Sequence, residues 1–517
     1  MTIIATGGKD VTAETIGAVH KVISGTGIGP TGTQEDLRKA TGTITLATGL
    51  VAYDLEAPSK TLYPILTPIR NVLPRTSKPS GAGTAANWRQ VDSIAGNSSL
   101  PMLGWVPEGQ RAARMQVNAS NKSASYVTIG LESDVTFEAQ SAAAGFEDEM
   151  AMTGARLLQQ TMTLEEIALL GGNASVLLGT PATPTLATAA TGGTIADATL
   201  KVYVFALTME GYLMATVAGG IKRSATITGM DNGTYSLNGG SSKSSAVGTQ
   251  VTAGGNTSTL SASTTAIKGA VAYAWYVGTS GAEKLEAITT INSMKLTALA
   301  GTGQAYSAIS DASTDRSLNT TAFDGLLYSG FNSATAYYVA LATGTAGTGT
   351  PLTASGRGTI TEIDTALKAF WDNYRLSPDV IYCHSQQLNS IMSLIFGGTA
   401  NGALRYTIAL DGDSPTAIAG IGSIKYPNPF KLDDNPVVPI KLHPFLPPGT
   451  IMFWCQNLPV FYQSSNVPMV AQVECRRDYY QIPWPIVTRA NATGVYSEEV
   501  LKVYAPFALG AITNISV

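Results

Sequence analysis

The stretch TFEAQSAAAGFEDEMAMTGARLLQQTMTLEEIALLGG, residues 136–172, is the clearest helical pattern in the chain. Acidic residues cluster early in it, and its apolar residues recur at near-helical spacing: Phe146, Met150, Leu157 and Met162. The glycine pair at 171–172 ends the pattern, because glycine is a common helix stop. We therefore expect one long helix over 136–170, a length suited to packing beneath a sheet.

The chain before this helix is extended rather than helical. Residues 66–130 contain NWRQVDSI, GWVPEGQRAARM and ASYVTIGLES, in which polar and apolar residues alternate around two loops. This alternation predicts a long β-hairpin with a polar tip. Residues 1–65 alternate Gly/Thr-rich stretches with short apolar runs and show no sustained period, which predicts an extended arm.

Composition changes after the helix. From about 175 to 312 the chain is rich in Thr, Ser, Gly and Ala, with strand candidates at 199–208, 270–278 and 285–291 and a turn signal at 230–233. These features predict a self-contained all-β module. Alternation along AVAYAWYVG places Tyr273, Trp275 and Val277 on one face and Ala274 and Tyr276 on the other.

Mixed α/β character returns from residue 320 onward. TEIDTALKAFWDNY (361–374) and SQQLNSIMSLI (385–395) are predicted helices on either side of a short buried strand. The tail alternates strands with proline turns, at 446–454, 466–478 and 498–515. The chain as a whole is thus predicted to be α+β.

Composition limits the function. The chain has 517 residues, too many for a single core, and only 13% are charged, against about 25% in ordinary soluble domains. Either much of the surface is covered by copies or partners, or it is Thr/Ser/Gly-rich and polar without charge; both interpretations stay open. The net charge of -4 excludes a strongly basic nucleic-acid-binding protein.

No catalytic, cofactor-binding or metal site is predicted. The Gly-rich stretches at 25–32 and 344–350 lack the Lys-Ser/Thr of a phosphate loop, and no HExxH, GxSxG or paired-cysteine motif occurs. Cys383 and His384 are neighbours in a predicted strand and so point to opposite faces, which favours a buried structural cysteine over a Cys–His pair.

The acidic residues that lie close together in the sequence are not predicted to form a site either. The acidic run at 147–149 is predicted to be a solvated helix face rather than a metal site. Glu165 and Glu166 are adjacent on a helix and are not expected to converge on one point. An enzyme such as a glycoside hydrolase would need convergent carboxylates, which the sequence does not indicate.

The termini and hydropathy suggest a soluble, cytoplasmic product. The start, MTIIATGGKDVTAETIG, has no basic region followed by an apolar run, so no signal peptide is predicted. No apolar stretch reaches about 18 residues, so no membrane span is predicted.

The order of arm, hairpin, helix, β insert, mixed domain and β-rich tail resembles the major capsid protein of tailed bacteriophages, which has the Hong Kong 97 (Johnson) fold. Local strings resemble that family as well: YPILTPIRNVLPR (63–75), VPEGQRAARM, ASYVTIGLESDVTFEAQSAAAGFEDEM, LEEIALLGGNAS (164–175), RLSPDVIYCHSQQLNSI and HPFLPPGTIMFW. The resemblance covers roughly 60–512, apart from the insert.

The resemblance implies an α+β, Hong Kong 97-like capsid fold with an inserted all-β sandwich. Its expected parts are an N-terminal arm (1–65), an extended loop (66–130), a spine helix with peripheral domain (131–174), an inserted Ig-like or fibronectin-type sandwich (175–312), an axial domain (313–445) and a return to the peripheral domain (446–517). The insert is expected to project outward, as a stabilising decoration or for weak adhesion to glycans.

The implied function is structural and non-enzymatic. The chain would self-assemble into hexamers and pentamers of an icosahedral phage head enclosing double-stranded DNA, in the virion and, during assembly, in the host cytoplasm. Implied partners are packaged DNA and a portal, with either a separate scaffold or none, and with decoration proteins as a further option; no membrane and no cofactor is implied. Candidates for non-specific DNA contact are Arg38, Lys39, Arg70 and Arg75. Lys78 and Lys122 lie in or near the loop that some family members crosslink, but nothing in the sequence fixes a partner.

Two other functions stay open. An encapsulin-type nanocompartment shares the fold but stores a protein cargo. A bacterial surface adhesin with Ig-like modules would carry a secretion signal and tandem sandwiches, neither of which the sequence predicts.

Overall fold

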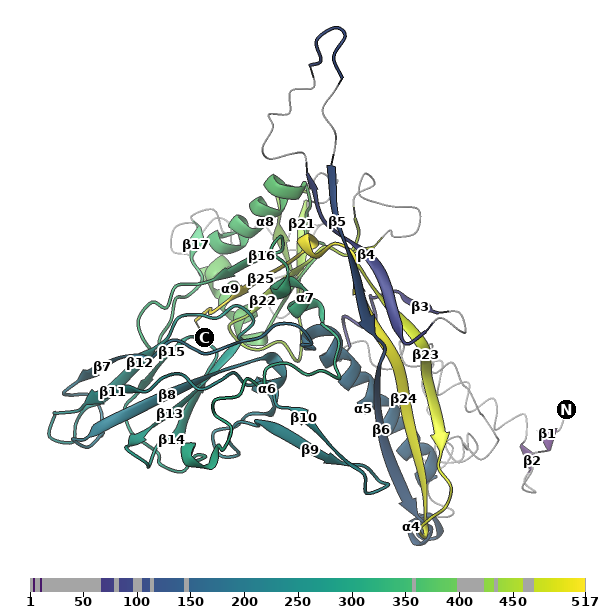
Figure 1. The fold of residues 1–517 in the computed structure, drawn as a ribbon, viewed down its shortest axis with the longest axis horizontal. Coiled ribbons are helices and arrows are strands. Elements are labelled where there is room, and N and C mark those ends of the chain that lie inside the picture. Colours follow the sequence, from purple (N-terminus) through teal and green to yellow (C-terminus); the bar gives the residue numbers. More distant parts are fainter. Residues whose placement is uncertain are drawn as a thin grey trace, which may run out of the picture. The chain divides into compact units, whose positions relative to one another are not determined.

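The chain forms two compact units, each built from separate stretches of sequence. Their helices and strands are labelled in Figure 1. The structure, a computed structural model, describes residues 3–4, 10–11, 67–78, 83–95, 105–111, 116–143, 148–355, 359–397, 423–431, 436–458 and 469–516. Unit 1 comprises Met1–Ala82, Tyr126–Glu166 and Glu474–Val500, and unit 2 comprises Gly83–Ser125, Ile167–Val473 and Leu501–Val517. Helices occur beside mostly antiparallel sheets, which confirms the α+β class. Nearly all of the predicted arm lies outside the described residues; within it, β1 (Ile3–Ile4) pairs with β2 (Asp10–Val11).

A sheet of long strands forms the frame of unit 1. Its order is β3 (Arg75–Ser77), β23 (Ala471–Pro483), β24 (Ala490–Val503) and β6 (Val127–Thr136), and β24 runs antiparallel to β6. Helix α5 (Glu149–Gly171) packs on this sheet through Leu157 and Met162, which contact Tyr479 and Val495. The apolar residues of α5 thus pack beneath a sheet, as their spacing in the sequence predicts.

The predicted single helix over 136–170 is wrong in one respect, because the structure contains two helices. Helix α4 covers Phe137–Ala143, and α5 starts afresh at Glu149. Asp148 accounts for the new start: its Oδ1 accepts the backbone N–H groups of Met150 and Ala151, as an N-cap residue does. The predicted stop is confirmed, since α5 ends at Gly171, where a Cβ would lie 2.3 Å from the Met209 sulfur.

The predicted long hairpin is confirmed within unit 2. Strands β4 (Ala85–Ala95) and β5 (Gln116–Ser125) pair antiparallel along their whole length, with a register shift between Val91 and Ser93. The Trp88 indole Nε1 donates to the Val503 carbonyl at 3.0 Å, and the Val91 N–H donates to the Tyr504 carbonyl at 2.8 Å. These bonds fix the hairpin to the body of its own unit.

A six-stranded mixed sheet forms the largest core of unit 2. Its order is β16 (Tyr337–Ala340), β25 (Leu509–Thr513), β22 (Ile451–Trp454), β19 (Val380–Cys383), β21 (Val437–Leu442) and β20 (Ser423–Pro427). Helices α8 (Thr361–Tyr374) and α9 (Ser385–Gly397) confirm the two predicted helices. Phe370 of α8 packs with Ile381 and Phe453 of the sheet. Helix α7 (Leu326–Asn332) precedes this region.

Two further sheets of unit 2 lie between residues 185 and 296. One has the order β11 (Gly248–Val251), β8 (Thr199–Leu207), β13 (Ala272–Thr279) and β14 (Lys284–Thr289); the other has β15 (Ser293–Leu296), β12 (Thr259–Ser263) and β7 (Thr185–Ala189). One apolar cluster takes Val204 and Trp275 from the first sheet and Leu260 from the second.

The predicted alternation along β13 is confirmed. Tyr273, Trp275 and Val277 belong to the apolar cluster shared by both sheets. Ala274 and Tyr276 belong to a separate cluster on the opposite face of β13. Both faces of this strand are therefore buried.

Small elements complete unit 2. They are α6 (Met209–Met214), the hairpin of β9 (Ser224–Thr228) with β10 (Thr234–Asn238), the pair of β17 (Ala354–Ser355) with β18 (Thr359–Ile360), and short 3₁₀ turns at Tyr306–Ala308 and Pro506–Ala508. The turn predicted at 230–233 joins β9 to β10, and Asn232 adopts a φ of 61° there. Among the described residues, no helix combines the length and apolar character needed to cross a bilayer.

Candidate assembly elements and a buried charge cluster

Unit 1 contains an unusual group of buried ionisable side chains, here called the charge cluster. Its members come from the segment before and within β3, from α5, and from β23 and β24: Arg70, Arg75, Glu165, Glu166, Asp478, Tyr479 and Glu499. The side chains of Arg70, Glu165 and Glu499 are 0% exposed, and that of Arg75 is 4% exposed. Buried charges are costly unless they are paired, so these groups depend on one another.

Glu165 is the centre of the cluster. Its Oε2 lies 2.6 Å from Arg70 Nε, and its Oε1 accepts from Arg75 Nη1. The Tyr479 hydroxyl donates to the same carboxylate. Both guanidinium groups also lie over the Tyr479 ring, with Cζ atoms 5.1 and 5.5 Å from its centroid.

Glu166 binds the main chain of the same segment. Its two carboxylate oxygens accept the N–H groups of Ile69 and Arg70, at 2.9 and 2.8 Å. Glu165 and Glu166 thus bind the same residue, Arg70, through different atoms. Adjacent helix residues diverge in direction, but here one carboxylate binds the Arg70 side chain while the other binds its backbone.

Arg75 joins the helix to two strands. Besides Glu165, its Nη2 lies 2.6 Å from Asp478 Oδ1 on β23 and 2.9 Å from Glu499 Oε2 on β24. A planar guanidinium with several donors is suited to such multiple pairing. Arg75 thus fixes the start of β3 against α5, β23 and β24.

The pKa values of two buried carboxyl groups, those of Glu165 and Glu499, shift in opposite directions. Burial opposes ionisation of Glu165, but the charges of Arg75 and Arg70 hold its pKa below the ordinary value. Burial and the charge of Glu165 together raise the pKa of Glu499 to about 8, because they outweigh the attraction of Arg75. Glu165 therefore favours its ionised form at neutral pH, while Glu499 holds a proton more readily than an ordinary glutamate.

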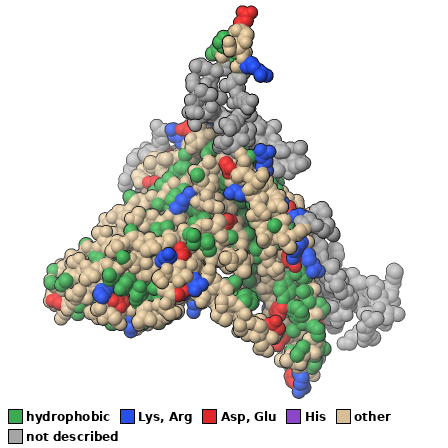
Figure 2. Space-filling model, in the orientation of Figure 1, with side chains coloured by type: hydrophobic (Ala, Val, Ile, Leu, Met, Phe, Trp, Pro, Cys, Tyr) green, Lys and Arg blue, Asp and Glu red, His purple; other side chains and the backbone are tan. Residues whose placement is uncertain are grey.

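The burial of Arg70 and Arg75 corrects their predicted role as DNA contacts. Both guanidinium groups are enclosed and paired with carboxylates, so they cannot reach a phosphate backbone in this conformation. The other two candidates, Arg38 and Lys39, lie outside the described residues. On the face drawn in Figure 2, Lys and Arg side chains are scattered among acidic and uncharged ones.

Exposed apolar residues mark the tip of the β4–β5 hairpin region. Trp105 is 88% exposed and Val106 is 44% exposed, although tryptophan is usually buried for most of its area. Of the two loop lysines, Lys78 lies 3.8 Å from Glu474 and over the Tyr126 ring, and Lys122 is half-buried. No crosslink through either lysine is predicted.

The chain enters and leaves the two-sheet region of unit 2 through two segments that are bonded together. The Asn173 side chain donates to the Ser317 carbonyl at 2.9 Å, and the Asp324 carboxylate accepts the N–H groups of Ala174 and Ser175. Asn292 lies between β14 and β15, and its N–H donates at 2.7 Å to the side chain of Asn514, which directly follows β25 of the six-stranded sheet. The two-sheet region is thus bonded to the six-stranded sheet rather than loosely tethered.

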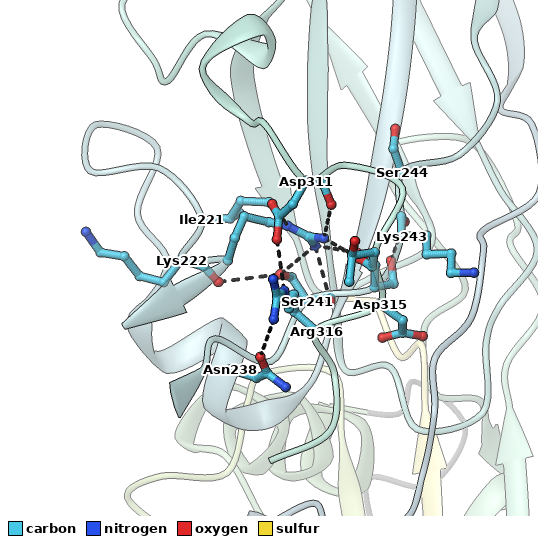
Figure 3. Close-up of polar contacts among 12 residues, drawn as sticks. Ile221, Lys222, Asn238, Ser241, Lys243, Ser244, Asp311, Asp315 and Arg316 are labelled. Carbon is cyan, nitrogen blue, oxygen red and sulfur yellow. Dashed lines mark hydrogen bonds and ion pairs between the residues drawn. The ribbon is translucent and has the colours of Figure 1, made fainter. Parts of the chain in front are cut away.

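A second group of hydrogen-bonded polar side chains connects the loops of the two-sheet region (Figure 3). Asp311 accepts from Arg223 Nε at 3.2 Å and from Arg316 Nε at 2.9 Å. Arg223 also donates to Ser241 Oγ at 2.9 Å, while Arg316 reaches Asn238 Oδ1 at 3.1 Å. Burial opposes ionisation of Asp311, but bonds from Arg316 and Arg223 hold its pKa below the ordinary value.

Two of the motifs that sequence analysis set aside have structural roles, while the Gly-rich stretch 25–32 lies outside the described residues. Cys383 is buried in β19, where burial raises the pKa of its thiol to about 12, and the neighbouring His384 accepts the Gln386 N–H through Nδ1. In the stretch 344–350, Gly347 has a φ of 80° and its N–H donates to Ser293 Oγ. The described part of the chain holds no group of three or more His, Cys, Asp or Glu side chains placed to bind a metal.

Sequence reasoning missed the charge cluster. Its members lie at positions 70, 75, 165, 166, 478, 479 and 499, so no local spacing brings all of them together. The available signal was the pair Glu165–Glu166 within an otherwise apolar end of a helix, where buried carboxylates demand partners.

Comparison with known proteins gives structural likenesses only. No protein-family model and no curated protein matches the chain. Among solved structures, the capsid of a native GTA particle matches with a TM-score of 0.39 and 9% identity, covering 87% of this chain and 91% of that one. The capsid of Myoviridae phage XM1 matches with a TM-score of 0.35 and 9% identity, covering 87% and 92%.

An encapsulin also matches. The holo-SrpI encapsulin complex from Synechococcus elongatus PCC 7942 gives a TM-score of 0.34 and 9% identity, covering 90% of this chain and 97% of that one. Identities and TM-scores of this size do not assign the chain to a family.

Proposed function

We propose that this chain is the major capsid protein of a tailed bacteriophage, with a Hong Kong 97-like fold. The order of its elements carries the proposal: a long two-stranded hairpin, a long helix packed under long antiparallel strands, and a mixed sheet flanked by helices. This is the order that the resemblance in the sequence implies.

The exposed parts of the chain support a role in self-assembly. An isolated two-stranded hairpin is marginally stable in water, so the long β4–β5 hairpin favours cover by a neighbouring copy. Apolar side chains are also exposed in the β23–β24 turn, where Ile486 is 63% and Val487 is 90% exposed. With only 13% charged residues, the chain suits extensive contact between copies.

The assembly would be a closed shell of hexamers and pentamers. Its partners would be a separate scaffold, a portal, decoration proteins and double-stranded DNA bound without base readout. Assembly would take place in the host cytoplasm. Because Arg70 and Arg75 are buried, other cations would have to make any DNA contact.

We further propose that residues 175–312 form an inserted Ig-like domain. In Ig-like folds strands B and E share one sheet and C, F and G the other. Assigning β7 and β12 to B and E, and β8, β13 and β14 to C, F and G, gives this distribution and the C–F–G neighbour order. Strand β15 departs from the pattern, because it is the last strand within residues 175–312 but pairs with β12.

A tyrosine supports this assignment. Tyr273 is near the start of β13, and its hydroxyl accepts the N–H of Ile267 at 3.0 Å, six residues upstream. Ig-like domains use the same arrangement, a tyrosine near the start of strand F bonded back to the preceding corner.

Electron microscopy of the purified full chain tests the proposed function. Expressed alone or with the neighbouring reading frames, it should form shells, tubes or capsomer rings in negative stain. Particles that copurify with a specific protein cargo rather than DNA would favour the encapsulin alternative. Absence of any particles, even with the neighbouring gene products present, would contradict a shell protein.

A further inference from the structure

We propose that the charge cluster is a proton-controlled latch. It holds the segment 67–77 against α5, β23 and β24 while Glu499 carries a proton, and it loosens that segment when Glu499 ionises. The inference concerns unit 1 alone and does not depend on the proposed function.

The segment is held mainly by polar contacts. Ile69 and Leu73 supply its buried aliphatic contacts, at 0% and 2% exposed. Its other attachments include the ion pairs of Arg70 and Arg75, the two main-chain N–H groups bound by Glu166, and the strand pairing of β3 with β23. A segment attached in this way responds to the charges around it more than to apolar packing.

Among the described residues, the ion pairs of the cluster are unbalanced. Two arginines, Arg70 and Arg75, pair with three carboxyl groups, those of Glu165, Asp478 and Glu499. Asp478 is 30% exposed and can be solvated, while both oxygens of Glu166 accept main-chain N–H groups. Glu499 is fully buried, and its Oε1 has no hydrogen-bond partner among the described residues. A buried carboxyl with an unpartnered oxygen is where a proton is held most readily.

Every element packed around Glu499 contributes to its environment. Glu165 faces it from α5 and Arg75 faces it from β3. Strand β23 contributes Cys475, Asp478 and Tyr479. On β24 itself, the Ser497 hydroxyl donates to Glu499 Oε2 at 3.0 Å. Of these, Arg75 and Ser497 favour the ionised form. Burial and the charge of Glu165 oppose it more strongly, which is why the pKa of Glu499 rises to about 8.

The sign of the pH effect follows from linkage. The proposal takes Glu499 to be solvated in the open form, with an ordinary pKa of about 4.3, so that the open form binds fewer protons between that pH and about 8. The latched form therefore becomes less favourable as pH rises through this window, by up to about tenfold per pH unit, and levels off above it. At the acid end, protonation of Glu165, whose pKa is lowered, removes its pairing with Arg70 and Arg75.

Hydrogen exchange measured by mass spectrometry on the full chain tests the latch. The reporter is a peptide covering 67–78, whose Ile69 and Arg70 amides bind Glu166, and its rates are corrected for the intrinsic pH dependence of exchange. The expected result is a protection factor that falls by about tenfold per pH unit from pH 6 toward pH 8. A peptide covering β13 reports any global unfolding and should keep its protection.

Two variants on one strand separate the latch from general effects of charge. Glu499→Gln mimics the protonated carboxyl, so the 67–78 peptide should lose its pH dependence. Glu498→Gln is the matched control, because Glu498 pairs with Arg476 at 2.6 Å, outside the cluster, and this variant should respond as the wild type does. Ser497→Ala provides a second test if Glu499→Gln does not fold: it removes a donor to the carboxylate and should move the transition to higher pH.

Either of two results would overturn the proposal. One is wild-type protection of 67–78 that is constant from pH 6 to pH 9. The other is the same fall in protection in a folded Glu499→Gln chain. Because the readout is local, it can fail whether or not the chain forms shells, and shell formation can fail while the latch responds as expected.

Discussion

The segment at 67–77 and the strand at 272–279 are both fixed to long strands, but by different forces. The first is attached by buried ion pairs around Glu165, and the second by apolar contacts on both of its faces. Ion pairs removed from water stabilise only while every partner keeps its charge, whereas apolar burial does not depend on pH. The comparison indicates that pH and single charge changes should affect unit 1 locally and leave the two-sheet region of unit 2 intact.

The largest expected effect is at the centre of the charge cluster. Glu165→Ala would leave Arg70 and Arg75 buried without their main partner, so the free energy of unfolding should fall by about 3–5 kcal/mol. Urea unfolding followed by circular dichroism measures this change. A loss below about 1 kcal/mol would mean that the cluster is solvated in solution.

A comparable loss should follow from emptying the apolar core of the two-sheet region. Trp275 is 0% exposed, and Trp275→Ala should cost about 3–5 kcal/mol through lost burial and a residual cavity. Trp484→Ala is the control, since that indole is 41% exposed and its removal should change stability by less than about 1 kcal/mol. Unlike the Glu165 variant, the Trp275 variant should show the same loss at pH 6 and pH 9.

A smaller effect is expected at the corner formed by Tyr273. Tyr273→Phe keeps the ring but leaves the Ile267 N–H without its acceptor, which should cost about 1–2 kcal/mol. Thermal unfolding of the variant measures the change, with Tyr235→Phe as an exposed control. No difference between the two variants would remove the support that this tyrosine gives to an Ig-like insert.

The smallest effect is expected for an exposed ion pair in unit 1. Arg489 and Glu138 lie 2.6 Å apart with side chains 81% and 59% exposed, so Glu138→Ala should cost less than about 1 kcal/mol. Its urea unfolding curve, compared with that of Glu165→Ala, shows how much burial contributes to the strength of a pair. Equal losses in the two variants would contradict the contrast between buried and exposed charges.

Local patterns in the sequence predicted the elements whose cause is local. Helices α8 and α9, the β4–β5 hairpin and the two faces of β13 follow from apolar periodicity within each stretch. The break before α5 was missed because one side chain, that of Asp148, caps the new helix, and an acidic residue in a helical pattern gives a weak signal.

Contacts between distant parts of the chain were not predictable in the same way. Arg70 and Arg75 were predicted as candidates for DNA contact, a role that requires exposed side chains. Their burial depends on Glu165, which is 95 and 90 residues away, and on Asp478 and Glu499 in the last strands. Such pairings are set by the tertiary fold and leave no periodic trace in the sequence.

Sedimentation velocity of the full chain, produced together with its neighbouring gene products, tests most directly whether this protein builds a shell. The account predicts a boundary far faster than that of a 53.7 kDa monomer, corresponding to capsomers or closed particles of many copies. A single slow boundary at the mass of the monomer, over a wide range of concentrations, would contradict it.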